Sequence, residues 1–130
     1  MIVIDASAMI EALVGRDADN KLFDALQTNL HAPHLLDVEV LSVLRGLTLG
    51  GKLTSDAAEQ ARADYFALTI ARYELSGLAE RVWDLRQGYT TYDASYLALA
   101  EVLRVPLYTC DRKLVGNAHH AEILVLTRTR

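Results

Sequence analysis

Short apolar runs alternate along the chain with longer segments of helical periodicity. The β-branched run at residues 2–4 is typical of a buried strand, and the segment after Asp5 predicts a helix that ends near Gly15. The same alternation continues to the end of the chain. It predicts further strands at residues 31–34, 70–75, 105–110 and 122–126, and further helices at residues 17–28, 35–47, 54–69, 76–87 and 93–104.

The order of these elements indicates the fold class. Strands separated by helical segments favour a three-layer α/β/α sandwich with a short, mainly parallel central sheet. The helix at residues 93–104 is apolar on nearly every side, so we expect it to lie buried between layers. The sequence shows no sign of a linker or an internal repeat, and residues 1–130 are predicted to form a single domain.

The composition limits the classes of partner and site. Hydrophobic residues make up 52% of the chain, enough to bury a core without disulfides. The net charge of −4 provides no global positive field, so any attraction to nucleic acid must be local or carried by a metal. The only cysteine, Cys110, excludes an internal disulfide and a Cys-rich zinc site. Without a signal peptide or a membrane-length apolar run, we expect a cytoplasmic protein with no membrane partner.

Three aspartates stand where strands end or helices begin. Asp5 and Asp111 each follow an apolar strand, and Asp93 begins the apolar helix. In open parallel sheets, ligands bind at the carboxyl ends of the strands, where the strand order reverses. Each aspartate has an alternative role as a helix N-cap, which contributes about 1 kcal/mol. Because the pattern recurs at two strands, it favours one shared site.

The helix at residues 35–47 carries two further acids near its start. Asp37 is close enough to the first turn to be a cap, and Glu39 lies on the flank of the apolar stripe. Periodicity alone does not choose between them as members of the site.

Four carboxylates gathered at one place need a positive partner, because like charges a few ångströms apart raise each other's pKa. Magnesium or manganese, held by carboxylates and water, also prepares an acidic pocket to accept a phosphodiester. Such a metal lowers the pKa of a bound water, orients it and neutralises the leaving oxygen. The residues therefore predict metal-assisted phosphodiester hydrolysis.

Four stretches of the sequence together resemble a known family. "VIDAS" contains Asp5, "DVEVLSVLRG" contains Glu39, "TTYDASYLALAE" contains Asp93 and "YTCDRKL" contains Asp111. No one of these motifs is specific. In this order and spacing, over nearly the whole chain, they resemble the PIN-domain ribonucleases, specifically the VapC-type toxins of bacterial toxin–antitoxin pairs.

The resemblance implies roles for individual residues. It implies a magnesium or manganese cluster, and it leaves Asp37 as a cap. The hydroxyl groups of Ser7 and Thr109 would support the cluster. Arg86 would lie near the site, although it fits a solvated helix end equally well. The four implied catalytic and metal-binding residues are Asp5, Glu39, Asp93 and Asp111.

Residues after the last aspartate have more than one interpretation. Arg112 and Lys113 would contact RNA phosphates or belong to solvated surface. Relatives often carry a further acid or asparagine here, for which Asn117 is the only candidate, and we do not assign it to the metal shell. His119 and His120 are predicted to form a polar turn before the last strand.

Three tyrosines surround Asp93 in the sequence: Tyr89, Tyr92 and Tyr96. Aromatic side chains stack on the bases of single-stranded RNA, but they also pack between helices. Helix packing is the favoured interpretation for Tyr96.

The resemblance implies an endoribonuclease that acts as a toxin by cleaving transfer or ribosomal RNA and so inhibits translation. It also implies a VapB-type antitoxin that covers the groove, a toxin homodimer and a toxin–antitoxin hetero-oligomer. Two alternatives remain. One is a catalytically silent PIN-like module that binds RNA or protein. The other is a receiver-type phosphoacceptor domain, which needs an aspartate at the end of a middle strand that residues 70–75 do not supply.

Overall fold

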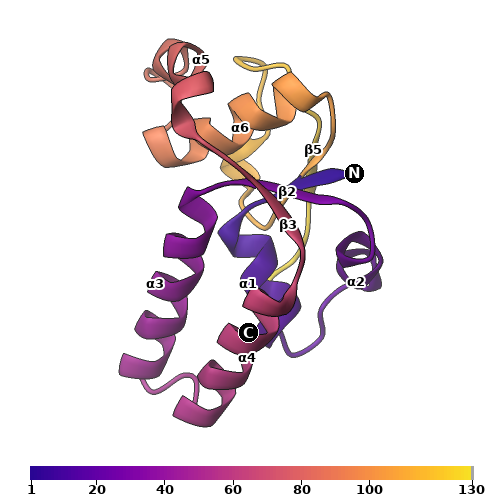
Figure 1. Ribbon diagram of the computed structural model, residues 1–130, viewed down its shortest axis with the longest axis vertical. Coiled ribbons are helices and arrows are strands. Elements are labelled where there is room, and N and C mark those ends of the chain that lie inside the picture. The colour runs from indigo at the N-terminus through magenta and orange to yellow at the C-terminus, as the bar shows by residue number, and fades with distance from the viewer. Residues whose placement is uncertain (130) are drawn as a thin grey trace.

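A parallel sheet of five strands forms the centre of the molecule (Figure 1). The computed structural model describes residues 1–129. The strand order is β3-β2-β1-β4-β5, and every neighbouring pair is parallel. The predicted fold class is confirmed. The strands are β1 (Ile2–Ile4), β2 (Leu30–Pro33), β3 (Ile70–Tyr73), β4 (Leu107–Thr109) and β5 (Ile123–Val125).

Helices cover both faces of the sheet. Figure 1 shows α3 and α4 side by side below the sheet, with α1 behind them, and α5 and α6 above it. The helices are α1 (Ala6–Val14), α2 (Asn20–Leu26), α3 (Leu35–Leu49), α4 (Ser55–Ala67), α5 (Ala79–Asp84) and α6 (Thr91–Leu103), with short 3₁₀ turns η1 (Leu75–Gly77) and η2 (Arg112–Leu114). Within residues 1–129, no helix is long and apolar enough to cross a membrane.

The central helix α6 is buried as expected. Every residue from Ala94 to Ala100 is buried, and α6 packs against β1, β2 and β4. Small residues such as Ala94 and Ala98 bring this helix close to the sheet, while Leu97 and Leu99 fill the core on either side. The helix is therefore a rigid support for the polar residues at its first turn.

The order of the sheet reverses between β1 and β4. From β1 the chain adds β2 and then β3 on one side, and the later strands β4 and β5 lie on the other side. Asp5 directly follows β1, and Asp111 follows β4 after one intervening residue. Both aspartates therefore lie at the carboxyl edge, where a parallel sheet of this kind places its ligands.

Two helices are shorter than the sequence pattern predicts. The segment expected to form one helix over residues 76–87 contains the turn η1 followed by α5, which ends at Asp84. Gly77 lies at the break, since glycine is a poor helix former. The helix predicted over residues 17–28 covers only Asn20–Leu26, and it begins after Asp19, whose side chain accepts the backbone N–H of Lys21.

Candidate active site

Asp5 is fixed by three hydrogen bonds at the end of β1. Its Oδ1 accepts the backbone N–H of Ala8 at 3.0 Å and the hydroxyl of Ser7 at 2.7 Å. Its Oδ2 accepts the hydroxyl of Thr109 at 2.5 Å. Asp5 is thus the N-cap of α1, as its alternative role predicted. Capping leaves the carboxylate in a fixed orientation at the sheet edge.

Burial raises the pKa of the Asp5 carboxyl above its ordinary value. The hydrogen bonds from Thr109, Ala8 and Ser7 act in the opposite direction, because they favour the ionised form, and the nearby charge of Asp93 raises the pKa again. A cation at this edge would offset both the burial and the repulsion.

The hydroxyl groups of Ser7 and Thr109 connect two strand ends. The Ser7 hydroxyl accepts the N–H of Cys110 at 2.8 Å, and the Thr109 hydroxyl accepts the N–H of Asp111 at 3.0 Å. Each hydroxyl therefore joins Asp5 to the backbone that follows β4. The spacing between the carboxylates of Asp5 and Asp111 depends on these two side chains.

Glu39 lies on α3, half-buried, and is held by α6. Its Oε1 accepts the hydroxyl of the buried Tyr96 at 2.5 Å. Burial raises the pKa of Glu39, the hydrogen bond from Tyr96 lowers it, and the charges of Asp5 and Asp93 raise it further. The three carboxylates therefore interact through space, although they come from three different elements.

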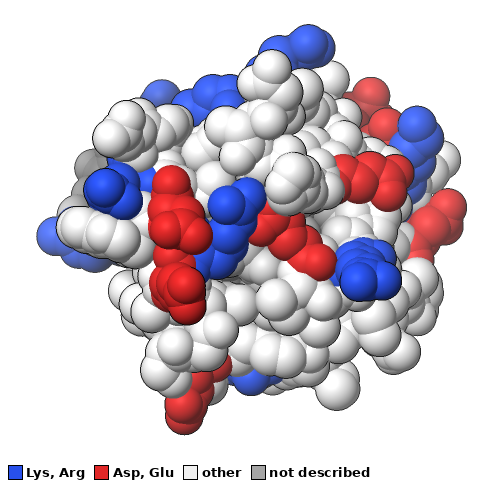
Figure 2. Space-filling model, turned by 90° about the horizontal axis from the view of Figure 1, so that it is seen from above, with Lys and Arg blue, Asp and Glu red and all other residues white. Residues whose placement is uncertain are grey.

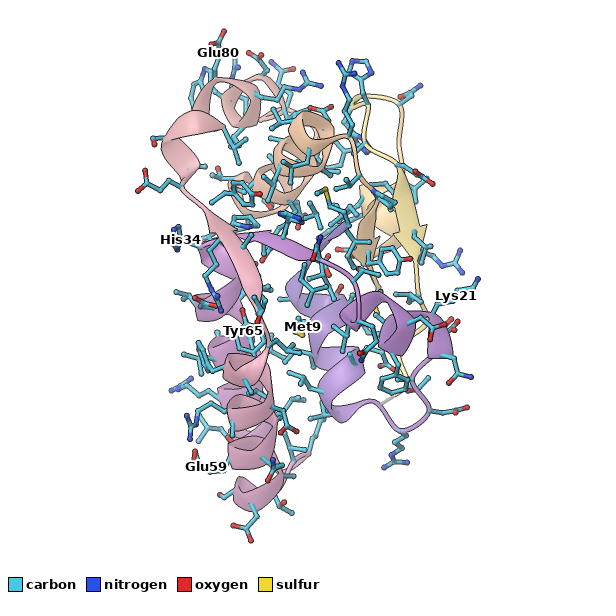
Figure 3. The ribbon with its side chains drawn as sticks, turned by 45° about the vertical axis from the view of Figure 1, so that its right-hand side comes forward. Met9, Lys21, His34, Glu59, Tyr65 and Glu80 are labelled. Carbon is cyan, nitrogen blue, oxygen red and sulfur yellow. The ribbon has the colours of Figure 1, made fainter. Side chains whose placement is uncertain are left out.

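Asp37 belongs to a separate polar cluster. Its two carboxylate oxygens accept Nε of Arg72 at 3.0 and 2.9 Å, and Oδ1 also accepts the hydroxyl of Tyr65 at 2.6 Å. Figure 3 labels Tyr65 on α4. The prediction that Asp37 caps its helix is wrong, because His34 occupies the N-cap position without a side-chain bond. Asp37 instead ties α3 to β3 and α4.

Asp93 and Asp111 share one cation from the chain itself. The Nζ atom of Lys113 lies 3.4 Å from Oδ2 of Asp111 and 3.7 Å from Oδ2 of Asp93. These two carboxylates, Asp93 first, raise the pKa of Lys113. Asp111 also accepts the backbone N–H of Lys113 at 3.1 Å and so caps η2. The N-cap of α6 is Thr90 rather than Asp93, since the Thr90 hydroxyl accepts the N–H of Asp93.

Asp5 and Asp111 thus follow the two strands between which the sheet order reverses, and Lys113 links Asp111 to Asp93. Comparison with known proteins shows the family. The profile of the family described as PIN domain matches residues 2–119. The chain belongs to the PIN-domain family. Within it, the chain is 42% identical to Ribonuclease VapC1 of Mycobacterium tuberculosis over 120 residues, and 41% identical to VapC ribonuclease Mb0985 of Mycobacterium bovis over 114 residues. Each match covers 88% of both chains. The chain is thus a VapC-type member of the family.

Two solved structures share the fold. PAE2754 from Pyrobaculum aerophilum superposes with a TM-score of 0.65 at 23% identity, covering 87% of this chain and 81% of that one. A toxin–antitoxin complex from Klebsiella pneumoniae gives 0.57 at 22% identity, covering 89% and 92%. The receiver-type alternative does not fit a chain of this family.

The donor set of this PIN domain fits a hard divalent cation. All four predicted ligands are carboxylates, which magnesium and manganese prefer, and the Lys113 ammonium marks a place between two of them where a positive charge is stabilised. As the side chains stand in residues 1–129, no three His, Cys, Asp or Glu residues are close enough together to form a ready-made metal site. The carboxylates would have to move together on binding.

Arg86, a further predicted site residue of the PIN domain, lies against Trp83. Arg86 donates to the carbonyl of Trp83 at 3.0 Å and lies over its ring, 4.6 Å from the centroid. This arrangement matches the alternative of a helix-end arginine, and the supporting role of Arg86 stays a prediction. Arg112 and Asn117 are exposed.

The histidine pair lies in the irregular segment before β5, with His120 exposed and His119 buried. His119 is buried, its Nδ1 accepts the N–H of Ala121 at 3.1 Å, and its Nε2 therefore donates to the carbonyl of Leu114 at 2.6 Å. The ring of Tyr89 packs against it with centroids 5.6 Å apart. The side chains of Tyr89 and His119 thus pack against each other before β5.

Sequence reasoning missed two contacts at this site. The hydrogen bond from Tyr96 to Glu39 was not expected, although Tyr96 lies three residues after Asp93 and hence on the same face of α6. The contact of Lys113 with both Asp93 and Asp111 was also missed, because the sequence left Lys113 either to RNA phosphates or to solvated surface. No sequence signal distinguishes those two roles of a lysine.

Proposed function

We propose that this chain is a magnesium- or manganese-dependent endoribonuclease and the toxin of a toxin–antitoxin pair. The observation that carries the proposal is the position of Asp5 and Asp111 after β1 and β4, the two strands between which the sheet order reverses. Asp93 on α6 is linked to Asp111 through Lys113, and Glu39 comes from α3. Relatives more than 40% identical carry the name ribonuclease.

In this proposal Asp5, Glu39, Asp93 and Asp111 hold the metal. When bound, the metal supplies an activated water and neutralises charge on the leaving oxygen of the phosphodiester. The chain's own residues set the geometry. Ser7 and Thr109 fix the Asp5 carboxylate, and Tyr96 fixes that of Glu39.

Lys113 and its neighbour Arg112 are the basic residues nearest in sequence to Asp111, and both are exposed. Seen from above, Figure 2 shows acidic and basic side chains interleaved rather than separated by sign. With a net charge of −4 on the chain, RNA phosphates would be attracted locally, by these two side chains and by the metal.

The proposed partners follow from the same assignment. The substrate is a cellular RNA such as transfer or ribosomal RNA, and the partner is a VapB-type antitoxin that covers the acidic groove. A toxin homodimer and a toxin–antitoxin hetero-oligomer complete the proposal. Action on such RNAs places the protein in the cytoplasm.

The decisive experiment is cleavage of RNA by the purified chain with magnesium or manganese and with EDTA. We expect cleavage with either metal and none with EDTA. Asp93→Asn should lower the rate by about a hundredfold or more, because even an indirect partner of a metal ligand contributes about 10–100-fold. Asp24→Asn, an exposed acid on α2, is the matched control and should cleave normally.

The alternative of a catalytically silent binding module makes a different prediction. It requires that the folded wild-type chain binds RNA or protein while cleaving nothing with either metal. Full cleavage in EDTA, or by Asp93→Asn, would contradict the metal mechanism but keep the nuclease assignment.

A further inference from the structure

A pocket of about 410 Å³ opens beside the carboxylates at the same edge of the sheet. Its floor is formed where β2 and β3 end, at Pro33 and Tyr73, and its walls come from the starts of α3 and α6 and from η1. β2 is the immediate neighbour of β1, which ends at Asp5. Neighbouring strands lie about 4.8 Å apart, so the pocket is one strand away from the proposed site.

Two helices run directly from the pocket to the carboxylates. Leu35 lines the pocket and Glu39 lies four residues later, on the same face of α3 and about 6 Å further along the axis. Tyr92 lines the pocket and is followed immediately by Asp93. A base bound in the pocket and a phosphodiester bound at the carboxylates would therefore be close enough to belong to the same RNA strand.

The lining selects a neutral, planar ligand. Among residues 1–129, no Lys, Arg, Asp or Glu lines this pocket, so it offers no counter-ion to a phosphate. Its surface is mainly apolar and aromatic, with His34 at the rim, and Figure 3 shows His34 at the outer edge where β2 passes into α3. The volume is within the range of pockets for one small ligand and is small for a docked helix.

One aromatic wall is fixed and the other is free. The Tyr73 hydroxyl is hydrogen-bonded to Nδ1 of His31 at 2.7 Å, and the two rings pack with centroids 5.7 Å apart. Tyr92 is 59% exposed, and within residues 1–129 its side chain has no hydrogen bond or ring partner. Leu75 on η1, which also lines the pocket, is 47% exposed. Unpaired bases stack on exposed aromatic side chains that lie beside a binding site for the RNA backbone.

We infer that this pocket binds an unpaired nucleobase of the RNA next to the scissile phosphodiester, with Tyr92 as the stacking residue. The inference rests on the proposed ribonuclease function for its substrate. It chooses among the three tyrosines near Asp93, since Tyr96 is buried against Glu39 and Tyr89 packs on His119. The pocket thus gives the site a preference for single-stranded substrate.

The test measures binding, so that it does not depend on cleavage. In the Asp93→Asn background, fluorescence anisotropy compares a labelled, randomised single-stranded RNA with an abasic ribose-phosphate chain of equal length. Tyr92→Ala should weaken binding of the RNA about tenfold, the size of one base–aromatic stack, and leave the abasic chain unaffected. Tyr92→Phe should retain the affinity. Phe23→Ala on α2, an aromatic residue that is 45% exposed, is the matched control and should also retain it.

A second variant approaches the pocket from another element. Leu75→Ala removes apolar surface from the pocket while leaving α6 unchanged, and it should also lower affinity for the RNA but not for the abasic chain. Equal losses on both chains, or no loss with either variant, would overturn the inference while wild-type cleavage still supports the ribonuclease. A loss restricted to the base-containing RNA would support the pocket even if the wild type cleaved nothing. Light scattering completes the test, because a drop in mass of either variant would show that a second copy covers the pocket, which also overturns the inference.

Discussion

The ammonium group of Lys113 lies 3.4 Å from the carboxylate of Asp111 and close enough to Asp93 to pair with both. The lysine reaches back from η2, two residues after Asp111, and its side chain is 66% exposed. It is therefore an exposed counter-ion of the two acids. A divalent cation that binds these carboxylates has to displace it.

Replacing this lysine should make metal binding tighter. In Lys113→Met the two carboxylates lose their internal cation, so we expect the dissociation constant for manganese, measured by calorimetry, to fall about fivefold at low salt and by less at high salt. Arg112→Met is the matched control, because Arg112 is exposed and adjacent, and its affinity should stay unchanged. Equal affinity of the wild type and Lys113→Met would show that Lys113 does not compete with the metal.

Asp37 and Glu39 should separate stability from activity. Asp37→Asn weakens the cluster with Arg72 and Tyr65, and chemical denaturation should show a loss of about 1–2 kcal/mol in the free energy of unfolding. Its cleavage per folded molecule should persist. Glu39→Gln should show the reverse, with loss of metal-dependent cleavage and little change in unfolding. If Asp37→Asn abolished cleavage while staying folded, the structural role of Asp37 would be wrong, and full cleavage by Glu39→Gln would remove Glu39 from the site.

The contrast between these two acids shows how far the sequence alone carries. Apolar strands that alternate with helices predict a parallel sheet, because the connecting helices cover both faces of such a sheet. The same alternation places Asp5 and Asp111 at one edge of the sheet. It does not distinguish Asp37 from Glu39, since both lie near the start of one helix. Their difference comes from Arg72 and Tyr65 on one side and Tyr96 on the other, residues that are distant in sequence and meet only in the folded chain.

The same limit applies to the pocket beside the site. Its lining comes from five elements between Pro33 and Ser95, and no one of them carries a motif. Tyr92 and Tyr96 are equally aromatic in the sequence, and only the packing of α6 leaves one exposed and buries the other. Local patterns thus predict elements and strand-end acids, whereas the shape between elements depends on tertiary packing.

Tyr96 should set the lower pH limit of activity. The Tyr96 hydroxyl lowers the pKa of Glu39 by favouring its ionised form, so Tyr96→Phe should raise that pKa. In the proposed mechanism Glu39 holds metal only when ionised, and the acidic limb of the pH–rate profile should therefore move to higher pH. Tyr65→Phe, which removes a similar hydroxyl from Asp37, should leave that limb in place. A profile of Tyr96→Phe identical to that of the wild type would contradict the coupling.

Glu101 should contribute a pH-dependent part of the stability. It accepts Nε and Nη2 of Arg81 at 2.8 and 3.0 Å and the N–H of His120 at 2.7 Å, and so ties α6 to α5 and to the turn before β5. The hydrogen bond from Arg81 is the main cause that lowers the pKa of Glu101, while burial opposes it.

A carboxyl whose pKa is lower in the folded state stabilises the fold at every pH above its unfolded value of 4.5, and it loses this contribution as the pH falls through the folded value. We therefore expect Glu101→Gln to lower the free energy of unfolding at pH 7 by about 1 kcal/mol, a modest figure because Arg81 is partly exposed. The gap between wild type and variant should close as the pH falls below 4.5. Urea denaturation of the wild type and Glu101→Gln at a series of pH values measures this difference in the free energy of unfolding. A gap that stayed constant into the acid range would mean that shape rather than charge of Glu101 stabilises this corner of the molecule.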